Sequence, residues 1–190
     1  MKIRTFPFHI AYFFLFTLAA TAHAENDVIS GTDTLPGYIG AMVGGNIPAD
    51  SGVGPTAAIA VTLGSRLGNS FGVGLFASYY GQTSTGPYLG LPASTAMSVI
   101  LATAQGNVFL GGLHFGAEVG AAIRSWSGVA STLVGGTATS STTLLIGIDA
   151  GYDYKISRNL SLGVEGHYFF PGAATEANGS QVFAVLKIWL

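Results

Sequence analysis

The sequence predicts an all-β protein: an eight-stranded antiparallel transmembrane β-barrel that follows an N-terminal signal peptide. The chain is apolar, with 8% charged residues and a mean hydropathy of +0.51. Beyond the first 24 residues, however, no run of about 18 apolar residues could cross a bilayer as a helix. Apolar residues instead alternate with small or polar ones in segments of about ten, which is typical of transmembrane strands. Because only helices and closed barrels can pair every backbone group within lipid, these observations together favour a barrel.

Residues 1–24 have the features of a secretory signal peptide. Lys2 and Arg4 precede an apolar run, and an A-x-A cleavage motif ends at Ala24. We expect residues 1–24 to be removed and residues 25–190 to form the barrel as one domain. The expected location is the bacterial outer membrane, reached by export through the periplasm.

Composition excludes several classes of protein. The chain has no cysteine, so it can form neither a disulfide framework nor a lipoprotein anchor. Without Lys2 and Arg4 it keeps five basic and nine acidic side chains, a formal charge of −4, and it has no basic cluster. Nucleic acid is therefore not an expected partner.

The eight strands and their connections can be placed from the alternation and the turn residues. We predict strands at 36–46, 56–66, 70–81, 95–109, 113–126, 141–155, 159–170 and 180–190. Three connections are short. The others, at 47–55, 82–94, 127–140 and 171–179, are long and rich in Gly, Ser, Thr, Ala and Pro. Short turns face the periplasm in such barrels, which places both ends of the barrel chain on that side.

Charge decides which face of each strand points into the lumen. A Lys or Arg facing lipid at mid-bilayer costs about 2 to 4 kcal/mol, so charged residues are expected inside. In 113–126 this choice also places His114 inside. The segment 95–109 stays open, because Val99 and Leu101 share a face with Thr103 and Gln105. The inward charges define a candidate lumen network: Glu118, Arg124, Asp149, Asp153, Glu165, His167 and Lys187.

Eight strands enclose a lumen that side chains can fill. We therefore expect these charges to satisfy one another, with Lys187 held by one or more of Glu118, Asp149 and Glu165. A water-filled or gated ion path is the alternative. The facing assignment also predicts that Leu162→Arg impairs insertion, whereas Ser161→Arg is milder if the lumen can accommodate the larger side chain.

Aromatic residues gather near the predicted strand ends, as in the two interfacial girdles of membrane barrels. Strand propensity alone also enriches aromatics, so the pattern has a second explanation. The turn-side set is Phe71, Phe109, Phe115 and Tyr154, and the loop-side set is Tyr79, Tyr80, Trp126, Tyr168 and Phe170.

Two segments carry a family likeness. Residues 147–154, the turn 157–159 and residues 160–168 resemble the penultimate hairpin of OmpA-type and OmpX-type small outer-membrane barrels. Residues 182–190 are similar to the C-terminal strand that the barrel-assembly machinery recognises in that family, although the chain ends on Leu190 with Trp189 one place earlier. The resemblance implies outer-membrane lipids and lipopolysaccharide as surroundings, and the assembly machinery as a partner during insertion.

The expected function is a structural, envelope-integrity or surface-interaction role, with a narrow pore or small-solute channel as the alternative. A lipid A deacylase is disfavoured, because the His-x-Ser motif of those enzymes is absent after His167. His114 and His167 show no metal-ligand spacing. We therefore expect no catalytic, cofactor-binding or metal residues. The sequence leaves open the extracellular ligand and the oligomeric state.

Overall fold

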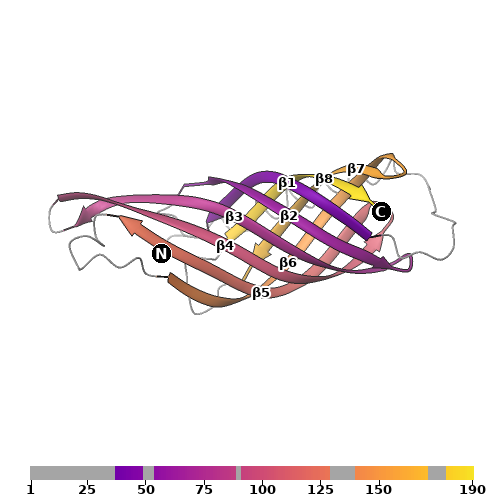
Figure 1. The fold of residues 1–190 in the computed structure, drawn as a ribbon, viewed down its shortest axis with the longest axis horizontal. Helices are drawn as coiled ribbons and strands as arrows, with labels where there is room; N and C mark the ends of the chain where they lie inside the picture. The colour runs from indigo at the N-terminus through magenta and orange to yellow at the C-terminus, as the bar shows by residue number, and fades with distance from the viewer. Residues whose placement is uncertain (1–36, 49–53, 89–90, 129–139, 171–178) are drawn as a thin grey trace, which may run out of the picture.

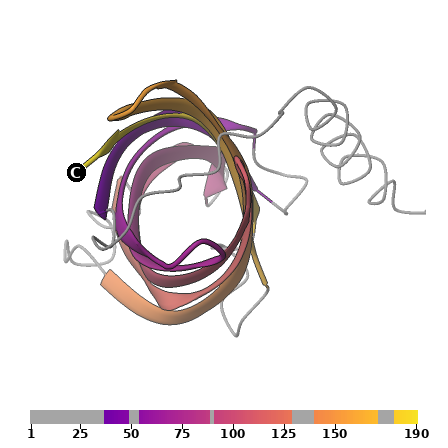
Figure 2. The same ribbon diagram turned by 90° about the vertical axis from the view of Figure 1, so that its right-hand side faces the viewer.

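The computed structural model describes residues 37–48, 54–88, 91–128, 140–170 and 179–190, with 84–88, 91–95 and 126–128 described by backbone alone. The predicted signal peptide at 1–24 lies outside these residues, as does most of the predicted loops at 47–55, 127–140 and 171–179. Within the described ranges, the strands form one closed antiparallel barrel in sequence order (Figures 1 and 2). The predicted fold class is therefore confirmed. No helix in the described ranges is long and apolar enough to cross a membrane.

Most strand bounds lie within two residues of the predicted ones. The strands are β1 (Gly37–Pro48), β2 (Thr56–Leu67), β3 (Phe71–Tyr88), β4 (Leu91–Leu110), β5 (Leu113–Gly128), β6 (Ser140–Ser157), β7 (Leu160–Phe169) and β8 (Gly179–Trp189).

The long loop predicted at 82–94 is wrong. β3 and β4 remain paired from Gly81 opposite Ser98 to Tyr88 opposite Leu91, and this hairpin extends past the end of β2 (Figure 1). The stretch is polar and carries Pro87 and Pro92, which made it resemble a loop. Threonine nevertheless has a high strand propensity, and a strand that projects beyond the apolar wall needs no apolar face.

The three short turns lie together at one end of the barrel, which we call the turn end. Gly68 and Gly111 occupy two of them with φ of 78° and 66°, in the left-handed region that glycine adopts without strain. Tyr38 near the start of β1 pairs with Trp189 at the end of β8, at the same end. The opposite end, where the β3–β4 hairpin projects, is the loop end.

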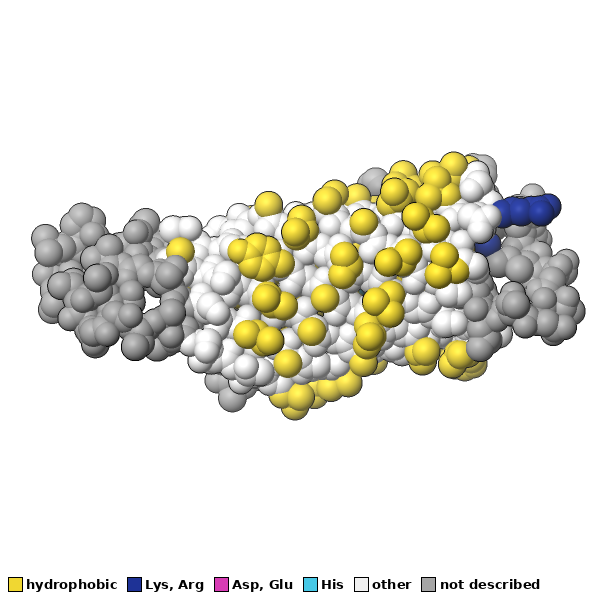
Figure 3. All heavy atoms as spheres, viewed as in Figure 1, with side chains coloured by type: hydrophobic (Ala, Val, Ile, Leu, Met, Phe, Trp, Pro, Cys, Tyr) yellow, Lys and Arg dark blue, Asp and Glu magenta, His cyan; other side chains and the backbone are white. Residues whose placement is uncertain are grey.

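Large apolar side chains cover the outside of the wall, as Figure 3 shows for one face. On β5, Val119 is 52% exposed while its neighbour Glu118 is 2% exposed, and similar alternation runs along β6, β7 and β8. Every Asp and Glu that the structure describes is buried. The inward and outward faces predicted for these four strands are those observed.

The facing of β4, which the sequence left open, is settled by the structure. Val99, Leu101, Thr103 and Gln105 are buried in the lumen, whereas Ile100 points outward. One face of this strand carries both apolar and polar residues because the lumen itself changes character along its length.

Two of the predicted girdle residues are instead inside. Phe109 is 3% exposed and Tyr80 is 2% exposed, so both fill the lumen. The strand-end position of an aromatic residue does not by itself say which face it occupies. Outward exposure is observed at both ends for Phe71, Phe115, Tyr154, Tyr79 and Phe170. Tyr168 is partly exposed, and the side chain of Trp126 lies outside the described residues.

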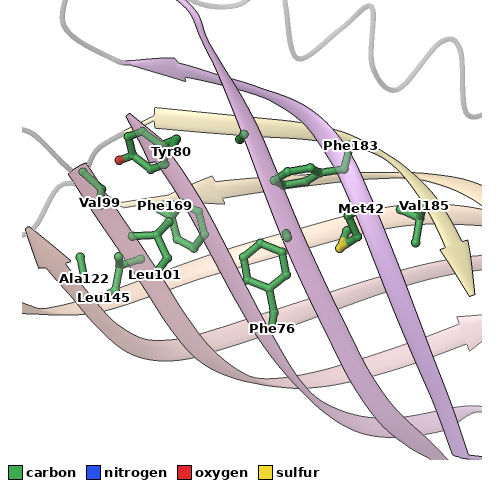
Figure 4. Close-up of a cluster of buried hydrophobic side chains, with 12 residues drawn as sticks. Met42, Phe76, Tyr80, Val99, Leu101, Ala122, Leu145, Phe169, Phe183 and Val185 are labelled. Atoms are coloured by element: carbon green, nitrogen blue, oxygen red, sulfur yellow. The ribbon is translucent and has the colours of Figure 1, made fainter. Parts of the chain in front are cut away.

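A cluster of apolar side chains fills the lumen between the polar network and the loop end. Its members come from all eight strands, and Figure 4 shows the labelled side chains lying inside the barrel. The members are Met42, Ala58, Ala60, Phe76, Tyr80, Val99, Leu101, Ala122, Leu145, Phe169, Phe183 and Val185. We call this set the apolar cluster.

Candidate functional site

The turn-end half of the lumen holds a polar network, which is the candidate site. Its charged and imidazole groups come from β5 to β8 and are almost completely buried. We use the name polar network for His114, Glu118, Asp149, Asp153, Glu165, His167 and Lys187.

Lys187 is paired with two carboxylates at once. Its Nζ lies 3.0 Å from Asp153 Oδ2, to which it donates a hydrogen bond, and 3.2 Å from Glu165 Oε2. Lys187 is only 3% exposed, so these carboxylates replace much of the hydration that the ammonium loses. Glu165 was among the partners expected from the sequence, whereas Asp153 was not.

Histidine and glutamate alternate across the rest of the network. Glu118 Oε1 lies 3.1 Å from His167 Nδ1, and His167 Nε2 lies 3.3 Å from Glu165 Oε1. Glu165 Oε2 in turn lies 3.5 Å from His114 Nε2. Thr103 on β4 donates a hydrogen bond of 2.7 Å to Glu118, which is the last group in this series of contacts. The network therefore reaches across the lumen from β4 to β8.

Glycines make room for these large polar groups. In one row of the wall, Gly151 lies between His114 on β5 and Glu165 on β7. A Cβ on Gly151 would lie 2.6 Å from His114 Nε2 and 2.8 Å from the carbonyl oxygen of Val164. In the next rows, Gly116 faces Asp149 and Gly147 faces Glu118. The small inward residues are therefore required by the size of their neighbours.

His167 joins the network to the apolar cluster. Its ring stacks on Phe76 at a centroid distance of 4.1 Å and meets Phe183 edge-on at 5.8 Å. The same ring contacts Glu118 and Glu165 through its two nitrogens. With 2% of His167 exposed, no side of the ring is accessible to a lipid substrate outside the wall.

A layer of aromatic and polar side chains lies at the turn end. Trp189 Nε1 donates to Ser161 Oγ at 2.9 Å, and the indole ring packs against Tyr38 at 5.1 Å between centroids. The Arg66 guanidinium lies 4.1 Å from the ring centre of Phe109. Ser161 is fully buried, so the space that would make Ser161→Arg mild is already occupied.

Arg124 lies apart from the carboxylates. It is 2% exposed on β5 beyond Ala122, and the hydrogen bond found for it within the described residues runs from Nη1 to Thr143 Oγ1 at 3.4 Å. The sequence offered Arg124 as a partner for the inward acids because it shares their face. Arg124 lies near the loop end, and the apolar cluster lies between it and the carboxylates.

Several polar atoms of the network lack a hydrogen bond. Within the described residues, both ring nitrogens of His114, Glu165 Oε2 and His167 Nε2 have no hydrogen-bond partner of good geometry, although oppositely charged groups lie nearby. His114, Asp149 and Glu165 each offer one metal-ligand atom, and these atoms lie within 4.8 Å of one another. The sequence gave no spacing signal for this grouping, since it joins three strands.

Solved structures with the same fold are known, whereas no protein-family model and no curated protein matches the chain. Neisserial surface protein A is 16% identical, with a TM-score of 0.51 over 80% of this chain and 96% of that one. Ail, the attachment invasion locus protein of Yersinia pestis, is 11% identical, with a TM-score of 0.53 over 83% and 99%. The outer membrane protein OprG of Pseudomonas aeruginosa is 14% identical, with a TM-score of 0.53 over 84% and 95%. The chain has the fold of small outer-membrane β-barrels. At these identities the likeness concerns architecture alone.

Proposed function

We propose that this protein is an integral outer-membrane barrel with a closed lumen, whose role is structural, in envelope integrity, or in interactions at the cell surface. Insertion is supported by the closed sheet, which leaves no unpaired edge, and by the apolar outer wall. Outer-membrane lipids and lipopolysaccharide would surround this wall, and the barrel-assembly machinery would act during insertion.

The proposal of a closed lumen rests on two successive layers of packed side chains along the barrel axis. The apolar cluster fills the lumen toward the loop end, and the polar network crosses it toward the turn end. An ion crossing the barrel would have to displace both layers. A lumen filled in this way suits a rigid anchor that presents the connections at the loop end, such as the projecting β3–β4 hairpin.

Conductance of the folded protein in planar bilayers tests this proposal. We expect baseline current with no reproducible steps at neutral pH. A gel of the same preparation verifies that the protein is folded, because a folded barrel migrates differently before and after heating. Stable, cation-selective steps would overturn the closed lumen and support the alternative function, a narrow pore, because the network carries more carboxylates than lysines.

A further inference from the structure

We propose that His114, Asp149 and Glu165 bind one divalent transition-metal ion, of the Zn²⁺ type, inside the barrel. The three residues stand on the adjacent strands β5, β6 and β7, and each is at most 4% exposed. Their candidate ligand atoms lie within 4.8 Å of one another. Ligands held about 2.0 to 2.2 Å from a zinc ion lie roughly 3.3 Å apart, so side-chain rotations alone could close the site.

The orphaned polar atoms supply a second argument. Both nitrogens of the His114 ring are buried without a hydrogen bond, and so is Glu165 Oε2. A buried polar atom without a partner costs free energy, and native proteins usually satisfy such atoms with protein, water or an ion. His114 Nε2 lies 3.5 Å from Glu165 Oε2, and each of the two side chains offers a ligand atom within 4.8 Å of one on Asp149.

Asp149 is available as the third ligand. Lys187 pairs with Asp153 and Glu165, but within the described residues Asp149 has no ion pair. Its neighbour Asn107 can donate from its amide nitrogen to Asp149 Oδ1 at 3.3 Å when the amide is turned that way. This contact orients the carboxylate and leaves the other oxygen for a cation. Hydrogen bonds of this kind commonly orient the ligands of metal sites.

Charge balance favours a cation over a neutral guest. The turn-end half of the lumen holds four described carboxylates, Glu118, Asp149, Asp153 and Glu165, and two permanent cations, Arg66 and Lys187. One divalent ion would balance the remaining two negative charges with both imidazoles neutral. Two imidazolium ions would give the same balance, and a metal-binding experiment distinguishes the two arrangements.

Lys187 is the main competitor for Glu165, at 3.2 Å from Oε2. It would keep its shorter contact of 3.0 Å with Asp153 when Glu165 turns toward an ion. The ligand set of one imidazole and two carboxylates suits first-row divalent ions, since imidazole favours Zn²⁺ and related ions over Ca²⁺ or Mg²⁺.

The experiment uses the folded barrel in detergent without a histidine tag, treated with chelator and then dialysed against Zn²⁺ or Co²⁺. We expect one ion per chain, with Co²⁺ giving visible d–d absorption bands. His114→Gln and Asp149→Asn should each abolish stoichiometric binding. Tyr80→Phe is the control, because it removes a buried hydroxyl from the apolar cluster and leaves the charges of the polar network unchanged, so it should keep the ion.

Variants that fold, as judged by heat-dependent gel mobility, are compared directly. If His114→Gln and Asp149→Asn fail to fold, X-ray absorption of the Zn²⁺-loaded wild type decides, with one imidazole per zinc expected. The proposal is overturned if the wild type binds no stoichiometric ion, if either folded variant retains it, or if the zinc is coordinated by two imidazoles or none.

Discussion

The imidazole ring of His167 stacks on the phenyl ring of Phe76, with their planes 24° apart. His167 thereby belongs to the apolar cluster through its ring face and to the polar network through its nitrogens. Residues in direct contact rarely contribute independently to stability. The two layers of the lumen are therefore expected to unfold together.

Replacing Lys187 with methionine should destabilise the barrel strongly. The change leaves Asp153 and Glu165 buried without their cation, and breaking a buried pair in this way costs about 3 to 5 kcal/mol. Urea titration in detergent or lipid measures the loss. Arg158→Met, at an exposed turn position, is the control and should change the free energy of unfolding by less than about 0.5 kcal/mol. Equal stability of the two variants would show that Lys187 does not hold these carboxylates.

Gly151→Ala should lower stability by about 1 to 3 kcal/mol, because the new methyl group overlaps the His114 ring and the Val164 carbonyl oxygen. Gly106→Ala is the matched control, since a Cβ there meets nothing within 4 Å. It should be neutral, or stabilising by about 0.4 to 1 kcal/mol through the unfolded chain. Thermal unfolding of both variants checks the difference, and a tolerated Gly151→Ala would mean that His114 can leave its observed position.

Phe76→Ala should cost about 3 to 5 kcal/mol, since it opens a cavity in the apolar cluster beside His167. The adjacent Leu75 points outward and is 53% exposed, so Leu75→Ala should cost much less. Denaturant titration compares the two. Bilayer current should stay at baseline for Phe76→Ala, because the polar network still crosses the lumen. A steady current from this variant would show that the apolar cluster alone closes the barrel.

Val119→Arg tests the outer wall. Val119 lies midway along β5, where a cation facing hydrocarbon costs about 2 to 4 kcal/mol. Ser125→Arg places the same side chain on the same face nearer the loop end, where the cost falls to about 0 to 1 kcal/mol. The yield of heat-modifiable protein after refolding into lipid vesicles reports the difference. Comparable yields would contradict the position of the apolar wall along the strand.

Alternation was sufficient to predict the barrel, the strand bounds and the facing of β5 to β8, because a period of two is a local property of each strand. Alternation did not predict the facing of β4. The inward face of this strand carries Leu101 of the apolar cluster and then Thr103, which donates to Glu118 of the polar network. The extent of the β3–β4 hairpin was also missed, since a polar strand and a polar loop have similar compositions.

The candidate site was only partly predictable. Facing placed Glu118, Glu165 and Lys187 in the lumen, but partners depend on the stagger between strands, which no single segment encodes. Stagger brings Asp153 to Lys187 and carries Arg124 away from the acids. Ser161 is small because Trp189 occupies the space beside it. That relationship became visible only in three dimensions.

The pairing of Tyr38 with Trp189 has a consequence for the order of assembly. It belongs to the pairing of the first strand with the last, so the strand pair with the greatest sequence separation is the one that completes the ring. Until β8 is in place, β1 and β7 present bare edges that invite pairing with other chains. Contacts between residues so far apart in the sequence form slowly. The newly made chain must therefore pass through an open, aggregation-prone intermediate. Loss of the final strand would therefore be far more harmful than loss of an equal length from the β3–β4 projection.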